Sequence, residues 1–88
     1  MIDRTDLYWN GKKLGVIEQA NLDNFDFYGR WQSTCDKDYY SSFLETVEQE
    51  GGAFVSIGGG DSQLTGSVEI EPSDIIEIKL RNKPTPQK

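Results

Sequence analysis

The side chains that could carry out chemistry are few in this sequence. The 88-residue chain contains no histidine and a single cysteine, Cys35. Imidazole is the usual proton-transfer group near neutral pH, and imidazole and thiolate are the usual ligands of zinc. Cys35 is followed directly by Asp36, a negative neighbour that does not activate a thiol. We therefore predict a protein that is not an enzyme and that uses no cofactor and no metal ion.

Four Asn and Asp side chains between residues 21 and 26 precede Gly29 and invite comparison with a calcium-binding loop. An EF-hand loop has glycine at its sixth position and a bidentate glutamate at its twelfth. With Gly29 in sixth place, the twelfth residue is Cys35, so the ligand that should close the site is missing. The segment therefore indicates a solvated acidic loop.

Three consecutive glycines, residues 58–60, resemble part of a phosphate-binding loop. Such a loop continues with lysine and then serine or threonine, because the lysine neutralises phosphate charge. Here Asp61 follows, and its carboxylate would repel a phosphate. The glycines therefore predict a loose hairpin connection, and whether that connection has a function stays open.

The charge of the chain restricts its partners. Nine basic and fifteen acidic residues give a net charge of −6. Negative charge repels phosphate backbones and anionic membrane surfaces, so neither a nucleic acid nor a membrane is expected as a partner. A basic protein or a neutral ligand is a better match. No apolar leader or membrane-spanning run is present, and one cysteine forms no internal disulfide, which together favour a cytoplasmic protein.

The first third of the chain predicts three strands. Residues 7–9 and 12–17 flank Asn10-Gly11, the strongest short hairpin signal, and this turn would place Leu7 opposite Leu14. Residues 18–23 are polar and predict a loop. In residues 24–31 aromatic and polar side chains alternate, which predicts a strand with an aromatic inner face made by Phe25, Phe27 and Trp31. Gly29 within this strand indicates a bulge or a close backbone approach.

One helix follows. Asp36 or Asp38 can cap its first turn, and Gly51-Gly52 is expected to end it. An apolar stripe at helical spacing consists of Tyr39, Tyr40, Phe43, Leu44 and Val47. The exposed face carries Glu45, Glu48, Gln49 and Glu50. The last turn has no lysine or arginine to offset the negative end of the helix dipole. Either a basic residue from elsewhere covers this end, or it is an acidic patch kept for a partner.

Three more strands are expected after the helix. Residues 53–57 and 64–71 are the first two, with Val68 and Ile70 pointing inward in the second. A turn at residues 72–74 leads to a last strand in which Ile76, Ile78 and Leu80 alternate with charged residues. Glu69 is expected opposite or diagonal to Lys79 across these strands.

The predicted order is therefore β-β-β-α-β-β-β, an α+β fold. We expect an antiparallel sheet of about six strands packed on one central helix, or a strongly curled version of that sheet. Residues 1–82 form a single domain, and residues 83–88, with two prolines, form a flexible C-terminal tail.

The functional prediction is a small acidic binding domain that docks on a basic protein. Only size and charge support an analogy with the small acidic proteins that neutralise basic enzymes, such as bacterial immunity or antitoxin proteins. Exposed tyrosines and acidic groups would form the interface, because tyrosine gives contact area and carboxylates steer a basic partner. The expected partner-binding residues are Tyr8, Asp26, Tyr28, Asp38, Tyr39, Glu45 and Glu48.

Two alternatives remain open. The aromatic strand 24–31 could bind a carbohydrate or another small ligand, with Asp26 among its rings. The chain could instead be a structural protein that forms homodimers through an exposed edge strand.

Overall fold

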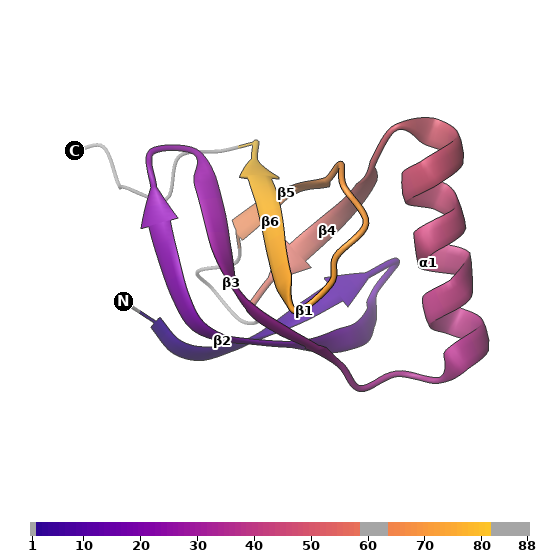
Figure 1. The fold of residues 1–88 in the computed structure, drawn as a ribbon, viewed down its shortest axis with the longest axis horizontal. Coiled ribbons are helices and arrows are strands. Elements are labelled where there is room, and N and C mark those ends of the chain that lie inside the picture. The colour runs from indigo at the N-terminus through magenta and orange to yellow at the C-terminus, as the bar shows by residue number, and fades with distance from the viewer. Residues whose placement is uncertain (1, 59–63, 82–88) are drawn as a thin grey trace.

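Six strands and one helix make up the computed structural model, which describes residues 2–58 and 64–81 (Figure 1). In chain order the elements are β1 (Ile2–Trp9), β2 (Lys12–Asp23), β3 (Asp26–Ser33), α1 (Lys37–Glu50), β4 (Ala53–Ile57), β5 (Leu64–Val68) and β6 (Ile75–Leu80). The predicted order of elements is confirmed. The α+β class fits only in part, because the structure is mostly sheet with one helix. The predictions for residues 59–63 and for the tail 83–88 concern residues outside the described part of the chain.

The sheet closes on itself as a barrel with the strand order β1-β2-β3-β6-β5-β4, and all neighbouring strands are antiparallel. Strands β1–β3 form one three-stranded meander and β4–β6 form another. The two meanders meet where β3 pairs with β6 and where β1 pairs with β4 through Leu7↔Ile57 and Tyr8↔Ser56. The expectation of six antiparallel strands packed on one central helix therefore holds only in part. The sheet is strongly curled into a closed barrel, and the helix packs against one end of it.

The interior of the barrel holds the core, so the sheet does not need a helix to cover its apolar face. Every strand contributes at least one fully or almost fully buried side chain to one cluster, which includes Leu7, Leu14, Ile17, Phe27, Val55, Val68, Ile76 and Ile78. Alternation explains most of these positions, because in β6 the side chains of Ile76, Ile78 and Leu80 are buried and those between them are exposed.

The helix lies across one end of the barrel, where β1 and β3 finish and β4 begins (Figure 1). Phe43 and Val47 are its buried side chains, and the predicted stripe of Tyr39, Tyr40 and Leu44 packs beside them against the core. Asp36 is the N-cap residue, but its side chain forms no capping hydrogen bond. Gly51 ends the helix in the left-handed conformation, at φ 76°, as predicted. No helix in the described residues is long and apolar enough to span a membrane.

The largest error in the sequence-based prediction is the loop at residues 18–23, which belongs to β2. That strand continues to Asp23, and a two-residue turn, Asn24-Phe25, leads into β3. An irregularity between Glu18 and Asn21 interrupts the pairing, and Gln19 has a φ of 55°. The polar residues 18–23 therefore belong to a bulged strand. A bulge changes the direction in which side chains point without ending the sheet. Phe25, expected on the inner face, lies in the turn and is 38% exposed.

A second bulge changes the register of the first hairpin. Trp9 pairs with Lys12 as the Asn10-Gly11 turn requires, but the register shifts between Leu7 and Tyr8. Leu7 therefore pairs with Gly15, not with Leu14, although both leucines remain fully buried. The two bulges explain how four consecutive residues of β2, Leu14 to Ile17, are all buried.

One expectation for the second meander is wrong. β5 ends at Val68, so Ile70 lies in the connection and is 70% exposed. Lys79 pairs directly with Ser67 and Asp26, so Glu69, two residues after Ser67, lies diagonal to it as expected, and its charge helps to raise the pKa of Lys79. Gly29 agrees with prediction, because a Cβ added there would lie 2.9 Å from the Cα of Ala20 on the neighbouring strand.

Candidate functional site

Five aromatic side chains pack together where α1 meets the barrel. The ring of Trp9 lies 5.2 Å from that of Tyr39 and 5.6 Å from that of Phe43, measured between centroids. The Tyr39 hydroxyl donates to the carbonyl of Trp9, and the indole Nε1 of Trp31 donates to the Tyr40 hydroxyl at 2.9 Å. These contacts hold the helix on the barrel end and fix Trp9 beside it, where one side of the helix meets the strands.

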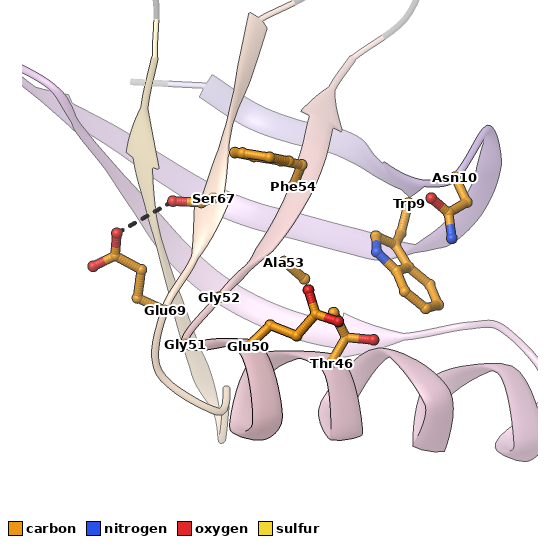
Figure 2. A pocket seen from close by; sticks show the side chains of 10 residues that line it. All are labelled: Trp9, Asn10, Thr46, Glu50, Gly51, Gly52, Ala53, Phe54, Ser67 and Glu69. Atoms are coloured by element: carbon orange, nitrogen blue, oxygen red, sulfur yellow. Dashed lines mark hydrogen bonds between the residues drawn. The ribbon is translucent and has the colours of Figure 1, made fainter.

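A groove of about 550 Å³ opens next to Trp9 (Figure 2). This volume lies within the range of ligand-binding sites, roughly 300–1,000 Å³. The side chains of Thr46 and Glu50 rise from α1 into the space, Trp9 forms one end and Glu69 the other (Figure 2). The remaining lining residues are Asn10, Gly51, Gly52, Ala53, Phe54 and Ser67.

The end of the helix shapes the floor of this groove. Gly51 takes the left-handed conformation that ends α1, and no heavy atom lies within 4 Å of the position a Cβ would occupy there. The following connection brings Gly52 against Glu69, whose Cγ would be 3.4 Å from a Cβ at that residue. The carbonyl end of the helix, which carries partial negative charge, therefore lies beside two carboxylates, Glu50 and Glu69.

Phe54 borders the groove and also a second cleft on the outer surface of the sheet. Its side chain is 65% exposed, although it occupies the middle of β4. The guanidinium of Arg81 lies 4.7 Å from the centre of the Phe54 ring. The second cleft has a volume of about 450 Å³ and includes Tyr8, Asn10 and Thr65. The two clefts thus share Asn10 and Phe54 and form one continuous recessed surface.

A third, shallower cleft of about 340 Å³ lies on another side of α1 and is lined by Glu45, Glu48 and Glu71 with Leu44 and two serines. Together with the glutamates of the groove, these residues surround the C-terminal half of the helix. We call the five side chains the acidic cluster: Glu45, Glu48, Glu50, Glu69 and Glu71.

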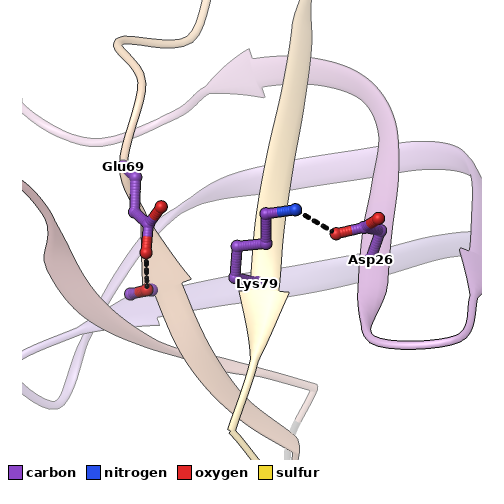
Figure 3. Close-up of polar contacts among 4 residues, drawn as sticks. Asp26, Glu69 and Lys79 are labelled. Carbon is purple, nitrogen blue, oxygen red and sulfur yellow. Dashed lines mark hydrogen bonds and ion pairs between the residues drawn. The ribbon is translucent and has the colours of Figure 1, made fainter.

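No cation of the described residues forms an ion pair with the acidic cluster. The chain contains no lysine or arginine between residues 38 and 78. The two ion pairs of the described residues are Lys13–Asp6 and Lys79–Asp26, and neither includes a glutamate of the cluster. Lys79 reaches Asp26 at 2.7 Å, whereas Glu69 accepts a hydrogen bond from the hydroxyl of Ser67 at 3.3 Å and acts on Lys79 only through its charge (Figure 3). Among the described residues, no basic side chain is paired with the last turn of α1.

The seven predicted partner-binding residues do not form one surface. Glu45 and Glu48 belong to the acidic cluster, and Tyr8 lines the second cleft. Asp26 and Tyr28 lie on β3 beside β6, where Asp26 is paired with Lys79 and Tyr28 is 38% exposed. Asp38 is exposed in the first turn of α1, where a carboxylate stabilises the helix dipole. Tyr39 packs against Trp9 inside the helix–barrel contact.

The aromatic strand offers little to a ligand. Phe27 is completely buried, and Trp31 is partly buried with its indole nitrogen bound to Tyr40. None of the three clefts is lined by a residue from 24 to 31. A carbohydrate site on this strand therefore gains no geometric support from the described residues.

Sequence reasoning did not select Trp9, Phe54, Glu50, Glu69 or Glu71 as site residues. The run of residues 38–78 without a basic side chain was a readable signal for the glutamates. Phe54 occupies an outward position in a strand whose neighbours Ala53 and Val55 are buried, so period-two alternation could have marked it as exposed. Trp9 could be assigned to the groove only once the position of the helix was known.

The described residues show no arrangement suited to catalysis by a thiol or a metal. The pKa of the Cys35 thiol lies above its ordinary value, mainly because burial disfavours the thiolate. No group of three or more acidic, cysteine or histidine side chains in residues 2–58 and 64–81 could hold a metal ion. The chain matches no protein-family model, and no curated protein and no solved structure resembles it significantly.

Proposed function

We propose that this protein is a non-catalytic binding module that docks on a basic protein partner through the acidic cluster. The observation that carries the proposal is the concentration of carboxylates around the C-terminal half of α1, none of which forms an ion pair among the described residues. Such an arrangement opposes folding, because like charges repel one another and the helix end is already negative. A basic partner would supply the missing positive charge.

Apolar side chains next to the acidic cluster provide the contact area that charge alone lacks. Phe54 is 65% exposed and Ile70, between Glu69 and Glu71, is 70% exposed. Protein interfaces typically join an apolar or aromatic centre to a polar rim. Carboxylates around such a centre would accelerate association with a basic protein and favour the correct partner.

Self-association is a weaker proposal in a closed barrel. Pairing between β1 and β4 is confined to Leu7 and Tyr8, and pairing between β5 and β6 to two residue pairs, so only short stretches of strand edge remain among the described residues. A dimer through this edge would also bring together two chains that each carry a net charge of −6.

Affinity capture with two charge-matched variants tests the proposed function. The first variant neutralises the acidic cluster (E45Q/E48Q/E50Q/E69Q/E71Q). The second neutralises five exposed carboxylates elsewhere (D3N/E18Q/D23N/D74N/E77Q). Each variant therefore loses five negative charges. The wild-type chain and both variants are used to capture proteins from the cells that produce it.

We expect the wild type and the second variant to retain a protein of high isoelectric point. The first variant should retain roughly tenfold less, and association should slow as NaCl rises from about 50 to about 500 mM. Failure of the wild type to capture any basic protein would contradict the proposal. Equal losses in the two variants would also contradict it, because they would show attraction by net charge without a defined surface.

A further inference from the structure

The groove beside Trp9 combines three features that together select one kind of side chain. It has an aromatic wall, two carboxylates and the carbonyl end of a helix. We propose that this groove receives an arginine side chain of the basic partner, with the guanidinium stacked on Trp9 and hydrogen-bonded to Glu50, while Glu69 at the far end adds negative charge. This inference rests on the proposed function and names the contact at its centre.

The position of Trp9 makes it suitable as the wall of such a site. Its backbone carbonyl accepts the Tyr39 hydroxyl, and its ring is packed against Tyr39 and Phe43. The indole therefore does not have to be ordered when a partner binds, which saves side-chain entropy. Tryptophan is also the aromatic side chain that attracts cations most strongly.

Glu50 is placed to complete the contact. It extends from the last turn of α1 toward the middle of the groove, whereas Glu69 stands at the end opposite Trp9 (Figure 2). Glu69 accepts a hydrogen bond from the Ser67 hydroxyl and its charge also acts on Lys79, so its attraction for a cation on Trp9 is weaker and acts at longer range. No lysine or arginine of the described residues lines the groove, and Glu50 forms no ion pair among them.

The protein already places its own cations on aromatic rings on both sides of the groove. Lys12 lies 4.8 Å from the centre of the Tyr39 ring, and Arg81 lies 4.7 Å from that of Phe54. The groove also has an aromatic ring, that of Trp9, but no lysine or arginine of the described residues lines it. Arginine fits better than lysine, because its planar guanidinium can stack on the indole and at the same time donate two hydrogen bonds to one carboxylate, that of Glu50.

The charge of the chain argues for a partner protein over a second copy of this chain. A second copy would add a net charge of −6 to a surface that is already acidic. A groove of about 550 Å³ has room for a side chain with its adjoining backbone, which suits an exposed loop or an extended segment of a basic protein.

The test uses capped hexa-arginine as the probe, capped hexa-lysine as its charge-matched comparison and the ¹⁵N-labelled full chain. Trp9 and Trp31 are the only tryptophans, so each titration reports two indole N–H signals. The hydrogen bond of Trp31 to Tyr40 makes it an internal control. We expect hexa-arginine to shift the Trp9 signal in a saturable manner, to leave that of Trp31 in place, and to bind roughly threefold or more tighter than hexa-lysine.

Single substitutions locate the effect. Glu50→Gln should weaken hexa-arginine binding by roughly threefold to tenfold, because it removes the carboxylate nearest Trp9. Glu69→Gln, at the far end of the groove, should weaken it by less than Glu50→Gln does. The matched control, Glu77→Gln on the outer face of β6, should leave binding unchanged. All three sites are exposed, so none of these changes threatens the fold.

Several results would overturn the inference. A stationary Trp9 signal, equal binding of hexa-lysine, or an equal effect of Glu77→Gln would each show that the groove does not select arginine. A Trp9 signal that moves with protein concentration alone would identify a second copy as the occupant. If the affinity capture depends on the acidic cluster while Trp9 stays unperturbed, only this inference fails. If Trp9 responds but no basic protein is captured, the proposed function fails instead.

Discussion

The two meanders of the barrel share one architecture but differ in their use of charge. In β1–β3, acidic and basic side chains are mixed, and Asp6 and Asp26 both form ion pairs, the second with Lys79 of β6. From α1 through most of β6, residues 38–78 contain nine acidic side chains and no basic one. Both halves nevertheless contribute fully buried side chains to the same core.

The two meanders contribute to the same core but differ in surface charge, so the surface charge can be considered separately from the packing that folds the barrel. The barrel requires buried apolar side chains and the turns and bulges that curve its strands, and both halves have them. On the proposed function, the barrel does not require the acidic cluster, because the charges of that cluster repel one another and the helix end. A surface that opposes stability in this way is expected where a protein binds a partner.

The largest effect on stability should come from the core that both halves share. Phe43 is completely buried between α1 and the barrel, whereas Phe54 of β4 is 65% exposed. Phe43→Ala should lower the free energy of unfolding by about 3–5 kcal/mol, because it leaves a cavity. Phe54→Ala should lower it by less than about 1 kcal/mol, mainly through the lost contact with Arg81.

Urea denaturation of the two variants checks this contrast. Similar losses in both would show that the recessed surface around Phe54 is part of the folding core and not a free binding surface.

A smaller effect is expected at the contact between the halves, where Trp31 of β3 donates to Tyr40 of α1. Burial is the main cause that raises the pKa of the Tyr40 phenol above its ordinary value of 10.0, and burial raises the pKa of Tyr39 in the same way. Because ionisation is harder in the folded state, this contribution to stability is complete below pH 10 and is lost as the pH rises above 10 through the raised pKa.

Tyr40→Phe should therefore lower the free energy of unfolding by about 1 kcal/mol at neutral pH, through loss of the hydrogen bond. It should also reduce the further loss of stability at alkaline pH. Unfolding curves measured from pH 8 upward test both effects. An unchanged alkaline loss in the variant would show that Tyr40 is not the group responsible.

The smallest expected effect concerns the ion pair between Asp26 and Lys79, which is exposed to solvent. The hydrogen bond to Asp26 raises the pKa of Lys79 above its ordinary value of 10.5, so the pair contributes below that pH and its contribution is lost above it. Asp26→Asn should destabilise the protein slightly in low salt and not at all in high salt. Glu77→Gln, which removes a neighbouring charge on β6 that has no ion pair among the described residues, should cause no loss in either condition.

The sequence predicts the order of the elements because most of them carry a clear apolar period. The helix stripe and the alternation in β6 are examples, and both are found as expected. Where a bulge interrupts the alternation of buried and exposed side chains, the sequence no longer predicts the strand or its register correctly. The polar residues 18–23 of β2 were assigned to a loop, and the predicted hairpin register is wrong by one residue from Leu7 toward the N-terminus.

The candidate site was only partly predictable, for a related reason. Glu45 and Glu48 could be recognised from helical spacing alone, because both lie on the exposed side of one element. The groove joins Trp9 of β1 to Glu50 of α1 and to Glu69 after β5, three segments that only closure of the barrel brings together. Local periodicity contains no information about that closure.

The central claim is that the acidic cluster serves binding and not folding. Urea unfolding of E45Q/E48Q/E50Q/E69Q/E71Q tests it most directly, because the measurement needs no knowledge of the partner. In low salt the variant should be at least as stable as the wild type, and relief of the last helical turn alone should add about 0.3–1 kcal/mol. This gain should shrink in high salt. A variant less stable than the wild type by more than about 1 kcal/mol would show that these glutamates hold the fold together, and would contradict the account.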